Sequence, residues 1–383
     1  MPTLLTRRAA LLFKIETTEG TDAAPVGATD GVLVENCRVT FNPNVIETNE
    51  VNPSLDPFEP IVGGMSSTIE FDVYMKGASG AAVAPEWGKM LKCCGYSETI
   101  SAAAIPAAPE ACAAGASPIQ ATLGPGAAAT AQLYRGMPVN FTGAVTLNSF
   151  IYDYSVAKLA KIANTALASI SATTNYQIQP NVLYVPASAS ISSATIYYFN
   201  DGIRYTFLGN RGTVAFNLVS GGPCKASFRF MGMLGTKTDV ALPTVTYDQT
   251  RPPVWKGGAL TLNSVAAAAG TLNLDTGNQL VQPDDPNETE AFDPAIIPLR
   301  QLRGTVNPKE TLVGTRDLMN AFRTQGKWPI HARYGITAGN RLGFTVPAAL
   351  FLNETPGDNN GYRIVDVPFD MAGQDSGLQI CSY

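Results

Sequence analysis

Alternating apolar and polar residues recur along the chain and predict β-strands. In Thr68–Met75 the apolar residues Ile69, Phe71 and Val73 alternate with polar ones, the period of a strand with one buried face. An Asn-Asp-Gly turn between 195–199 and 203–207 predicts a β-hairpin. Further strands are expected at 32–41, 213–219, 225–231, 259–262, 270–274, 301–306, 342–346, 348–352 and 362–369.

Only two short segments are predicted to be helical. Residues 85–95 open with Pro85, which suits the first helical position, and end at Gly95, which suits a C-terminal stop. Residues 315–323 form the second segment, with Thr315 as the expected N-cap. A fold with many strands and two short helices is mainly β.

The same order of elements occurs twice: strand, long Pro-rich loop, strand, short helix and a closing β pair. The two long loops are expected at 42–64 and 275–298, and the Ala/Pro-rich stretch 101–118 reads as a flexible linker. Residue identity between the halves is low, so we interpret the pattern as a duplication of architecture. The predicted division is an N-terminal arm (1–30), a discontinuous first domain (31–117 and 186–240), an inserted outer β module (118–185) and a second domain (241–383).

Composition narrows the class of protein. Hydrophobic residues make up 45% of the chain and charged residues 15%, which suggests that neighbouring subunits cover much of the surface. The 35 Gly and 27 Pro favour frequent turns and a β-rich fold. The net charge of −5 gives no basic field to attract nucleic acid, and no segment is apolar enough for a membrane span. The six scattered cysteines are expected to be free thiols.

Residues for common catalytic mechanisms are scarce. His331 is the single histidine and lies among apolar and aromatic neighbours, so we interpret it as packed rather than catalytic. Gly124-Pro125-Gly126 only superficially resembles a dinucleotide-binding turn, and no phosphate-binding loop occurs. The adjacent acids Asp284 and Asp285 are read as solvated residues rather than a glycosidase pair. We therefore expect a non-enzymatic protein with no metal and no cofactor.

The two long loops share an acidic character. They contain no Lys or Arg and carry acidic side chains, namely Glu47, Glu50, Asp56 and Glu59 in the first loop and Asp284, Asp285, Glu288, Glu290 and Asp293 in the second. On composition alone, the simplest reading is that these are solvated loops without a special role.

Several stretches, in this order, resemble the tail tube (major tail) proteins of long-tailed bacteriophages. The resembling segments are 7–16 with Glu19-Gly20-Thr21, 68–74, 84–91, 194–199 with Asp201-Gly202, 210–214, 274–279 and 357–361. Residues 120–178 resemble a small β module of phage structural proteins, in the pieces 121–124, 134–137, 151–154 and 172–178. The resemblance implies two tandem tail-tube-like β-sandwich or barrel units, each with a short helix, plus an inserted small β domain.

The resemblance also implies a function. Tail tube proteins close into stacked rings that conduct double-stranded DNA, so the expected partners are the chain itself and other tail proteins: the tape measure, the terminator and the distal tail protein. The expected location is the virion tail, after assembly in the bacterial cytoplasm. Two tube units per chain favour a pseudo-hexameric trimer, and one would require six chains. In such stacked rings, the nine acidic residues of the two long loops are candidates for ring-to-ring contacts or for the rim of the bore. The alternatives are a tail terminator, a baseplate hub, or a β-rich adhesin or carbohydrate-binding module.

Overall fold

The computed structural model describes residues 4–48, 50–78, 80–113 and 117–383. Strands make up 51% of the chain and helices 3%, which confirms the predicted mainly β fold. In the described residues the strands form sheets of 18, six and two strands. Residues 1–3, in the expected N-terminal arm (1–30), and residues 114–116, in the expected linker (101–118), lie outside the described part.

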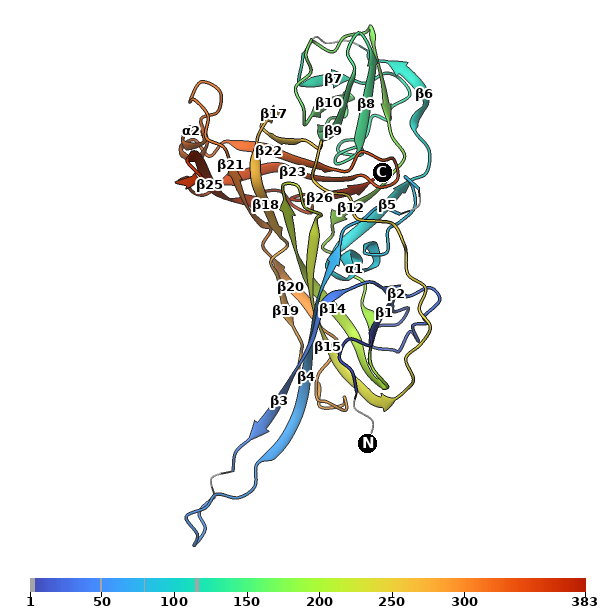
Figure 1. Cartoon of the computed structure of the whole chain (residues 1–383), viewed down its shortest axis with the longest axis vertical. Coiled ribbons are helices and arrows are strands. Elements are labelled where there is room, and N and C mark those ends of the chain that lie inside the picture. The colour runs from blue at the N-terminus through green and yellow to red at the C-terminus, as the bar shows by residue number, and fades with distance from the viewer. Residues whose placement is uncertain (1–3, 49, 79, 114–116) are drawn as a thin grey trace.

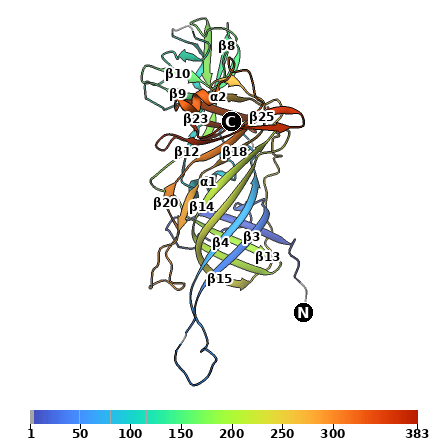
Figure 2. The same cartoon turned by 90° about the vertical axis from the view of Figure 1, so that its left-hand side faces the viewer.

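Eight antiparallel strands lie side by side and curve into a half-barrel (Figure 2). Their order is β3-β4-β15-β14-β18-β21-β25-β24. Their bounds are β3 (Glu35–Ile46), β4 (Ile61–Tyr74), β15 (Lys225–Asp239), β14 (Ile203–Val219), β18 (Ala269–Asp275), β21 (Arg303–Pro308), β25 (Tyr362–Met371) and β24 (Thr355–Asn359). Because side chains alternate along a strand, Phe71, Phe216 and Phe228 enter the core from one face, and polar residues occupy the other.

The remaining strands of the large sheet pack over the apolar face. They are β1 (Ala9–Ile15), β2 (Gly31–Val32), β5 (Tyr96–Ser101), β12 (Asn181–Pro186), β13 (Ala194–Asn200), β16 (Leu260–Leu262), β17 (Val265–Ala266), β22 (Lys327–Tyr334), β23 (Leu342–Phe351) and β26 (Gln379–Ser382). Strand β26 pairs with β12 on one side and β23 on the other. One apolar core runs through both halves of the chain, from Phe13 to Phe369.

Six strand pairings occur twice. In the first half they are β1–β2, β1–β13, β13–β14, β14–β15, β4–β15 and β3–β4. The matching pairings in the second half are β16–β17, β16–β22, β22–β23, β23–β25, β21–β25 and β18–β21. The β14–β18 pairing then joins the two half-sheets into one.

The two helices occur where the sequence predicts them but are shorter. Helix α1 (Gly88–Cys93) follows Trp87, whose buried indole Nε1 donates to the Lys76 carbonyl at 2.7 Å. It ends at Cys93, and Gly95, two residues later, has a φ of +81°, which suits the predicted C-terminal stop. Helix α2 (Leu318–Arg323) corrects the predicted cap: Asp317, not Thr315, accepts a hydrogen bond from the Asn320 amide at 2.8 Å.

Three segments that the sequence marks as irregular contain strands. Strands β3 and β4 extend into the expected loop 42–64, with a register shift between Pro43 and Val45. The expected loop 275–298 contains the paired strands β19 (Asn278–Val281) and β20 (Ile296–Arg300), and the expected linker contains β6 (Ile105–Ala111). Residues 213–219 continue β14, and 342–351 form the single strand β23. Proline is tolerated in such strands where it faces an edge or a bulge.

A separate six-stranded sheet lies at one end of the molecule (Figure 1). It consists of β6, β7 (Gln120–Thr122), β8 (Pro138–Gly143), β9 (Leu147–Tyr154), β10 (Leu159–Ile162) and β11 (Thr174–Ile178). It thus begins before the expected residue 118, while β12, expected inside the module, belongs to the large sheet. The sheet rests on the second half, where the Phe150 and His331 ring centroids are 4.2 Å apart. The division into domains stays a prediction.

A long hairpin projects from the opposite end (Figure 1). It is formed by the far ends of β3 and β4 and the loop between them, and we name residues 41–65 the arm. The helices of the described chain are too short and too polar to cross a membrane.

Candidate functional site

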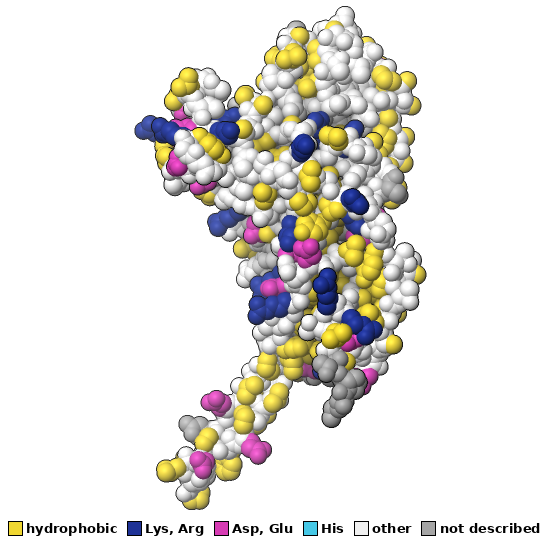
Figure 3. All heavy atoms as spheres, viewed as in Figure 1, with side chains coloured by type: hydrophobic (Ala, Val, Ile, Leu, Met, Phe, Trp, Pro, Cys, Tyr) yellow, Lys and Arg dark blue, Asp and Glu magenta, His cyan; other side chains and the backbone are white. Residues whose placement is uncertain are grey.

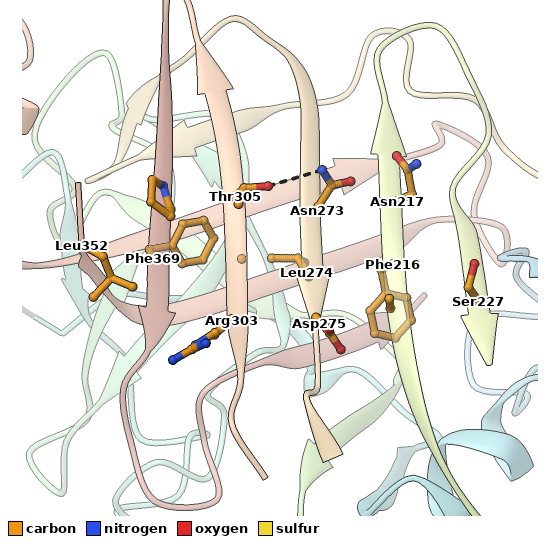
Figure 4. A pocket seen from close by; sticks show the side chains of 13 residues that line it. Phe216, Asn217, Ser227, Asn273, Leu274, Asp275, Arg303, Thr305, Leu352 and Phe369 are labelled. Atoms are coloured by element: carbon orange, nitrogen blue, oxygen red, sulfur yellow. Dashed lines mark hydrogen bonds between the residues drawn. The ribbon is translucent and has the colours of Figure 1, made fainter. Parts of the chain in front are cut away.

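The solvent-facing side of the eight-stranded sheet, here called the open face, carries polar side chains from every part of the half-barrel. Its side chains line up in rungs across the strands because the register of each pair places them opposite one another. One rung runs from Asp72 through Ser227 and Ala215 to Asp275 and Arg303. A neighbouring rung joins Lys225, Asn217, Asn273 and Thr305, shown in part in Figure 4.

Charges on the open face are paired across neighbouring strands. Arg229 Nε lies 3.3 Å from Glu70 Oε1, and Arg303 Nε lies 3.2 Å from Asp370 Oδ1. Lys225 Nζ lies 3.0 Å from Glu35 Oε2. The face carries the bases Arg38, Lys225, Arg229 and Arg303 and the acids Glu35, Glu70, Asp72, Asp275, Asp366 and Asp370. It therefore has a slight acidic excess and no cationic track.

Asp72 is the most connected of these acids. Its carboxylate accepts hydrogen bonds from Ser227 Oγ at 2.6 Å and from Asn36 Nδ2 at 2.8 Å, and Lys225 Nζ lies 3.4 Å away. Burial alone would raise the pKa of Asp72, but these hydrogen bonds and the Lys225 charge outweigh burial, so its pKa is lowered. The side chain is thus held ionised and in one position.

Two shallow hollows lie on the open face, with volumes of about 640 and 750 Å³. The first is lined by Asn217, Asn273, Thr305, Leu352 and Phe369 among others (Figure 4). Asn273 Nδ2 donates to Thr305 Oγ1 at 3.3 Å. Short neutral side chains and paired charges line both hollows.

The histidine and the cysteines do not form part of the open face, and all of them except Cys37 are buried. His331 is 1% exposed, and its Nδ1 is 2.9 Å from Thr345 Oγ1, so it is packed as predicted. Burial lowers the pKa of His331 to about 3, which keeps the ring neutral. All six cysteines are free; Cys37 is half-buried and the other five are buried. Cys93 and Cys94 both enter the core.

The structure places the nine predicted acidic residues in two separate loops, away from the open face. Glu47, Glu50, Asp56 and Glu59 are all exposed on the arm. In the second loop Asp284 and Glu288 are exposed, while Asp285, Glu290 and Asp293 are half-buried. The second loop packs against the first half of the chain, and the first loop extends into solvent (Figure 1).

Sequence reasoning missed the charged residues of the open face. Their signal is present in the strand pattern: Glu70 and Asp72 alternate with buried residues in β4, as do Lys225 and Arg229 in β15. Alternation shows that such residues share one face of a strand. It does not show that eight strands place them on one surface.

The open face ends in two strands that have a neighbour on one side only. In the described residues β3 pairs with β4 alone, and β24 pairs with β25 alone. A half-barrel with a free strand at each end can be extended by further copies.

Fold and surface together define a β-rich structural protein with a long polar sheet face. A family model described as phage tail tube protein matches residues 6–371, nearly the whole chain. The chain therefore belongs to the phage tail tube protein family, as the sequence resemblance predicted, and is a structural component of a virion tail. No curated protein matches the chain significantly.

Proposed function

We propose that three copies of this chain close head to tail into a ring, and that stacked rings form the tube through which phage DNA leaves the virion. The observation that carries this proposal is the half-barrel of eight strands with free edges at β3 and β24. In such a ring β24 of one chain pairs with β3 of the next.

The β14–β18 pairing inside the chain is the template for this contact. By the repeated pairing scheme, β23 and β24 together correspond to β14, and β3 corresponds to β18. Three chains would supply about 24 strands, which at roughly 4.8 Å spacing and a tilt near 40° give a barrel about 45–50 Å across. A barrel of that size is wide enough for duplex DNA.

The open face would then line the bore. A channel for DNA should not hold it, because each unpaired cation that neutralises a phosphate strengthens binding. Pairing of Arg229 with Glu70 and of Arg303 with Asp370 supports this role. Assembly takes place in the host cytoplasm, and the ring's other partners are the tape measure, terminator and distal tail proteins.

We also propose that the chain has no catalytic activity, since its single histidine is buried and neutral. A tail terminator or baseplate hub would share the fold but form a single ring. An adhesin or carbohydrate-binding module would be stable as a monomer. Self-assembly into many stacked rings separates the tube from these alternatives.

Electron microscopy of the purified protein, with averages of end-on views, tests the proposal. We expect hollow rings with threefold symmetry that stack into tubes. Rings made of six chains would still support the tube function but would contradict closure of the ring by three half-barrels. Particles without a central hole at every protein and salt concentration would contradict the tube.

A further inference from the structure

The two halves carry matching hairpins. The loop of the arm spans residues 47–60, and the loop between β19 and β20 spans 282–295, the same length. Each loop has an aromatic-acid-proline sequence near its end, Phe58-Glu59-Pro60 in the first and Phe292-Asp293-Pro294 in the second. The hairpins therefore correspond in position, in length and in part of their sequence.

The second hairpin docks within the chain, on the first half. The Ala295 amide donates to the Gly209 carbonyl at 3.2 Å, and Arg211 Nη1 donates to the Ala295 carbonyl at 2.7 Å. A Cβ on Gly209 would lie 2.6 Å from the Pro294 ring, so the two segments are in close contact. At the base of this hairpin, Asn278 Nδ2 donates to the Cys94 carbonyl at 2.8 Å, just after α1. The docking surface is thus β14 and the end of α1.

Only the base of the arm touches the rest of the described chain: the Phe41 ring lies 5.9 Å from that of Tyr205 on β14, and Gly64 lies against Glu290. Its apolar side chains are exposed, namely Phe41, Val45, Ile46, Val51, Leu55, Phe58, Ile61 and Val62. Val51 and Leu55 are fully exposed, at 105% and 104%. A continuous apolar surface on a projecting hairpin marks an interaction site. The arm also has four acids and no base (Figure 3).

The second half has a surface that corresponds to the docking site of the first. By the repeated pairings, α2 corresponds to α1, and β23 with β24 corresponds to β14. Around the end of α2 and the β23–β24 junction, six large apolar side chains are exposed, namely Leu312, Val313, Met319, Phe322, Leu352 and Tyr362. Arg323 and Lys327 are exposed beside them, and neither forms an ion pair within the described chain. We name this the α2 surface; Figure 3 shows Lys and Arg on this protrusion together with acidic side chains, and the acids Glu310, Asp317 and Glu354 lie close to one another.

We propose that the α2 surface binds the arm of a neighbouring copy in the same ring. The inference rests on the proposed head-to-tail ring, in which β3 of that neighbouring copy lies beside β24 of this chain. It repeats between chains the contact that the second hairpin makes inside the chain. The arm brings apolar side chains and negative charge, and the α2 surface offers apolar side chains and Arg323 and Lys327.

Site-specific photo-crosslinking tests this contact. Phe58, which is exposed, is replaced by the photo-reactive aromatic residue p-benzoyl-phenylalanine. The assembled rings are then irradiated and digested, and the cross-linked peptides are identified. We expect cross-linked peptides from 309–327 or 350–363 and covalent products no larger than a trimer. The matched control carries the same residue at Leu167, which is 107% exposed in the loop between β10 and β11, and should give no such peptides.

Two outcomes would overturn the inference. Cross-linked peptides from elsewhere would place the arm on another surface, and covalent ladders beyond the trimer would place it on the next ring. Both outcomes are observed on assembled rings. They are therefore distinguishable from failure of the proposed function, in which microscopy shows no rings.

A charge reversal gives a second, independent readout. Glu59→Lys alone and Arg323→Glu alone should each raise the protein concentration needed for assembly about tenfold, through like-charge contacts and lost pairing. The double variant should return to within about threefold of wild type. Both side chains are exposed, so circular dichroism and melting of the single chains should be unchanged. Additive defects in the double variant would contradict a direct contact.

Discussion

Single buried side chains hold the two halves and the six-stranded sheet together. Arg211 is 9% exposed and donates to the carbonyls of Ala295 and Ile191, which lie in different segments. Arg229, on the open face, forms an ion pair with Glu70, and the two side chains are 53% and 47% exposed. Arginines on neighbouring strands therefore have different energetic roles, decided by burial.

Replacing Arg211 by Met should lower the free energy of unfolding by about 2–4 kcal/mol, because the buried Ala295 carbonyl and the part-buried Ile191 carbonyl lose a charged donor and Glu19 loses its ion-pair partner. Arg229→Met, the control, should change it by less than about 1 kcal/mol, because that pair is exposed. Urea denaturation of both variants measures the difference. Equal losses would show that Arg211 does not hold the second hairpin.

His331 predicts a pH dependence of stability. Its pKa is lowered to about 3 in the folded chain, while an unfolded histidine titrates near 6.5. Between these values the unfolded state binds one more proton, so folding stability falls as the pH falls below about 6.5. The loss of folding stability from this histidine reaches about 2–3 kcal/mol at about pH 4.5, and it stops growing near pH 3.

Comparing His331→Gln with wild type isolates this contribution, because carboxylates respond to acid in both. Denaturation at about pH 8 and about pH 4.5 should show a smaller acid loss in the variant. Identical acid losses would mean that His331 is already charged in the folded chain.

Elements gain their structure from their partners more than from their own sequence. The Ala/Pro-rich residues 105–111 form β6 because β11 supplies hydrogen-bond partners. β19 and β20 pair within an expected loop, and β14 and β23 continue where the sequence suggested breaks. The helices, whose signals are local, were predicted in place, although α2 uses Asp317 rather than Thr315 as its cap.

The six-stranded sheet depends on Phe150 for its attachment. Phe150 is 1% exposed, its ring centroid lies 5.2 Å from that of Tyr383, and a Cβ on Gly343 would lie 2.5 Å from its ring. Phe150→Ala should therefore lower the free energy of unfolding by about 3–5 kcal/mol. Leu167→Ala, in the exposed loop between β10 and β11, should leave the free energy of unfolding almost unchanged. Chemical denaturation checks both, and equal effects would contradict a buried attachment.

The whole molecule joins two half-sheets into one polar surface. Charge on that surface is nearly balanced because Glu70, Asp370 and Asp72 each lie beside a base. No local motif reports this balance. It depends on the register of strands that are far apart in the chain.

Removing one acid from the open face should make assembled tubes retain DNA. Asp370→Asn leaves Arg303 unpaired in every chain, and cations facing DNA add salt-dependent binding. Co-sedimentation of tubes with duplex DNA should increase at about 50 mM salt and return to the wild-type level at about 300 mM. Asp153→Asn, which frees Lys161 in the six-stranded sheet, is the matched control and should not increase retention. Equal retention by both variants would place the open face away from the bore.

The sequence by itself determined the β class, both helices, the packed histidine and the family resemblance. Each rests on local alternation, on turn residues or on the order of short motifs. Tertiary structure decided the half-barrel, its two free edges, the paired charges of Glu70 and Arg229, and the docking of Pro294 beside Gly209. These depend on strand partners and register across long sequence separations, which the pattern of a single strand does not encode.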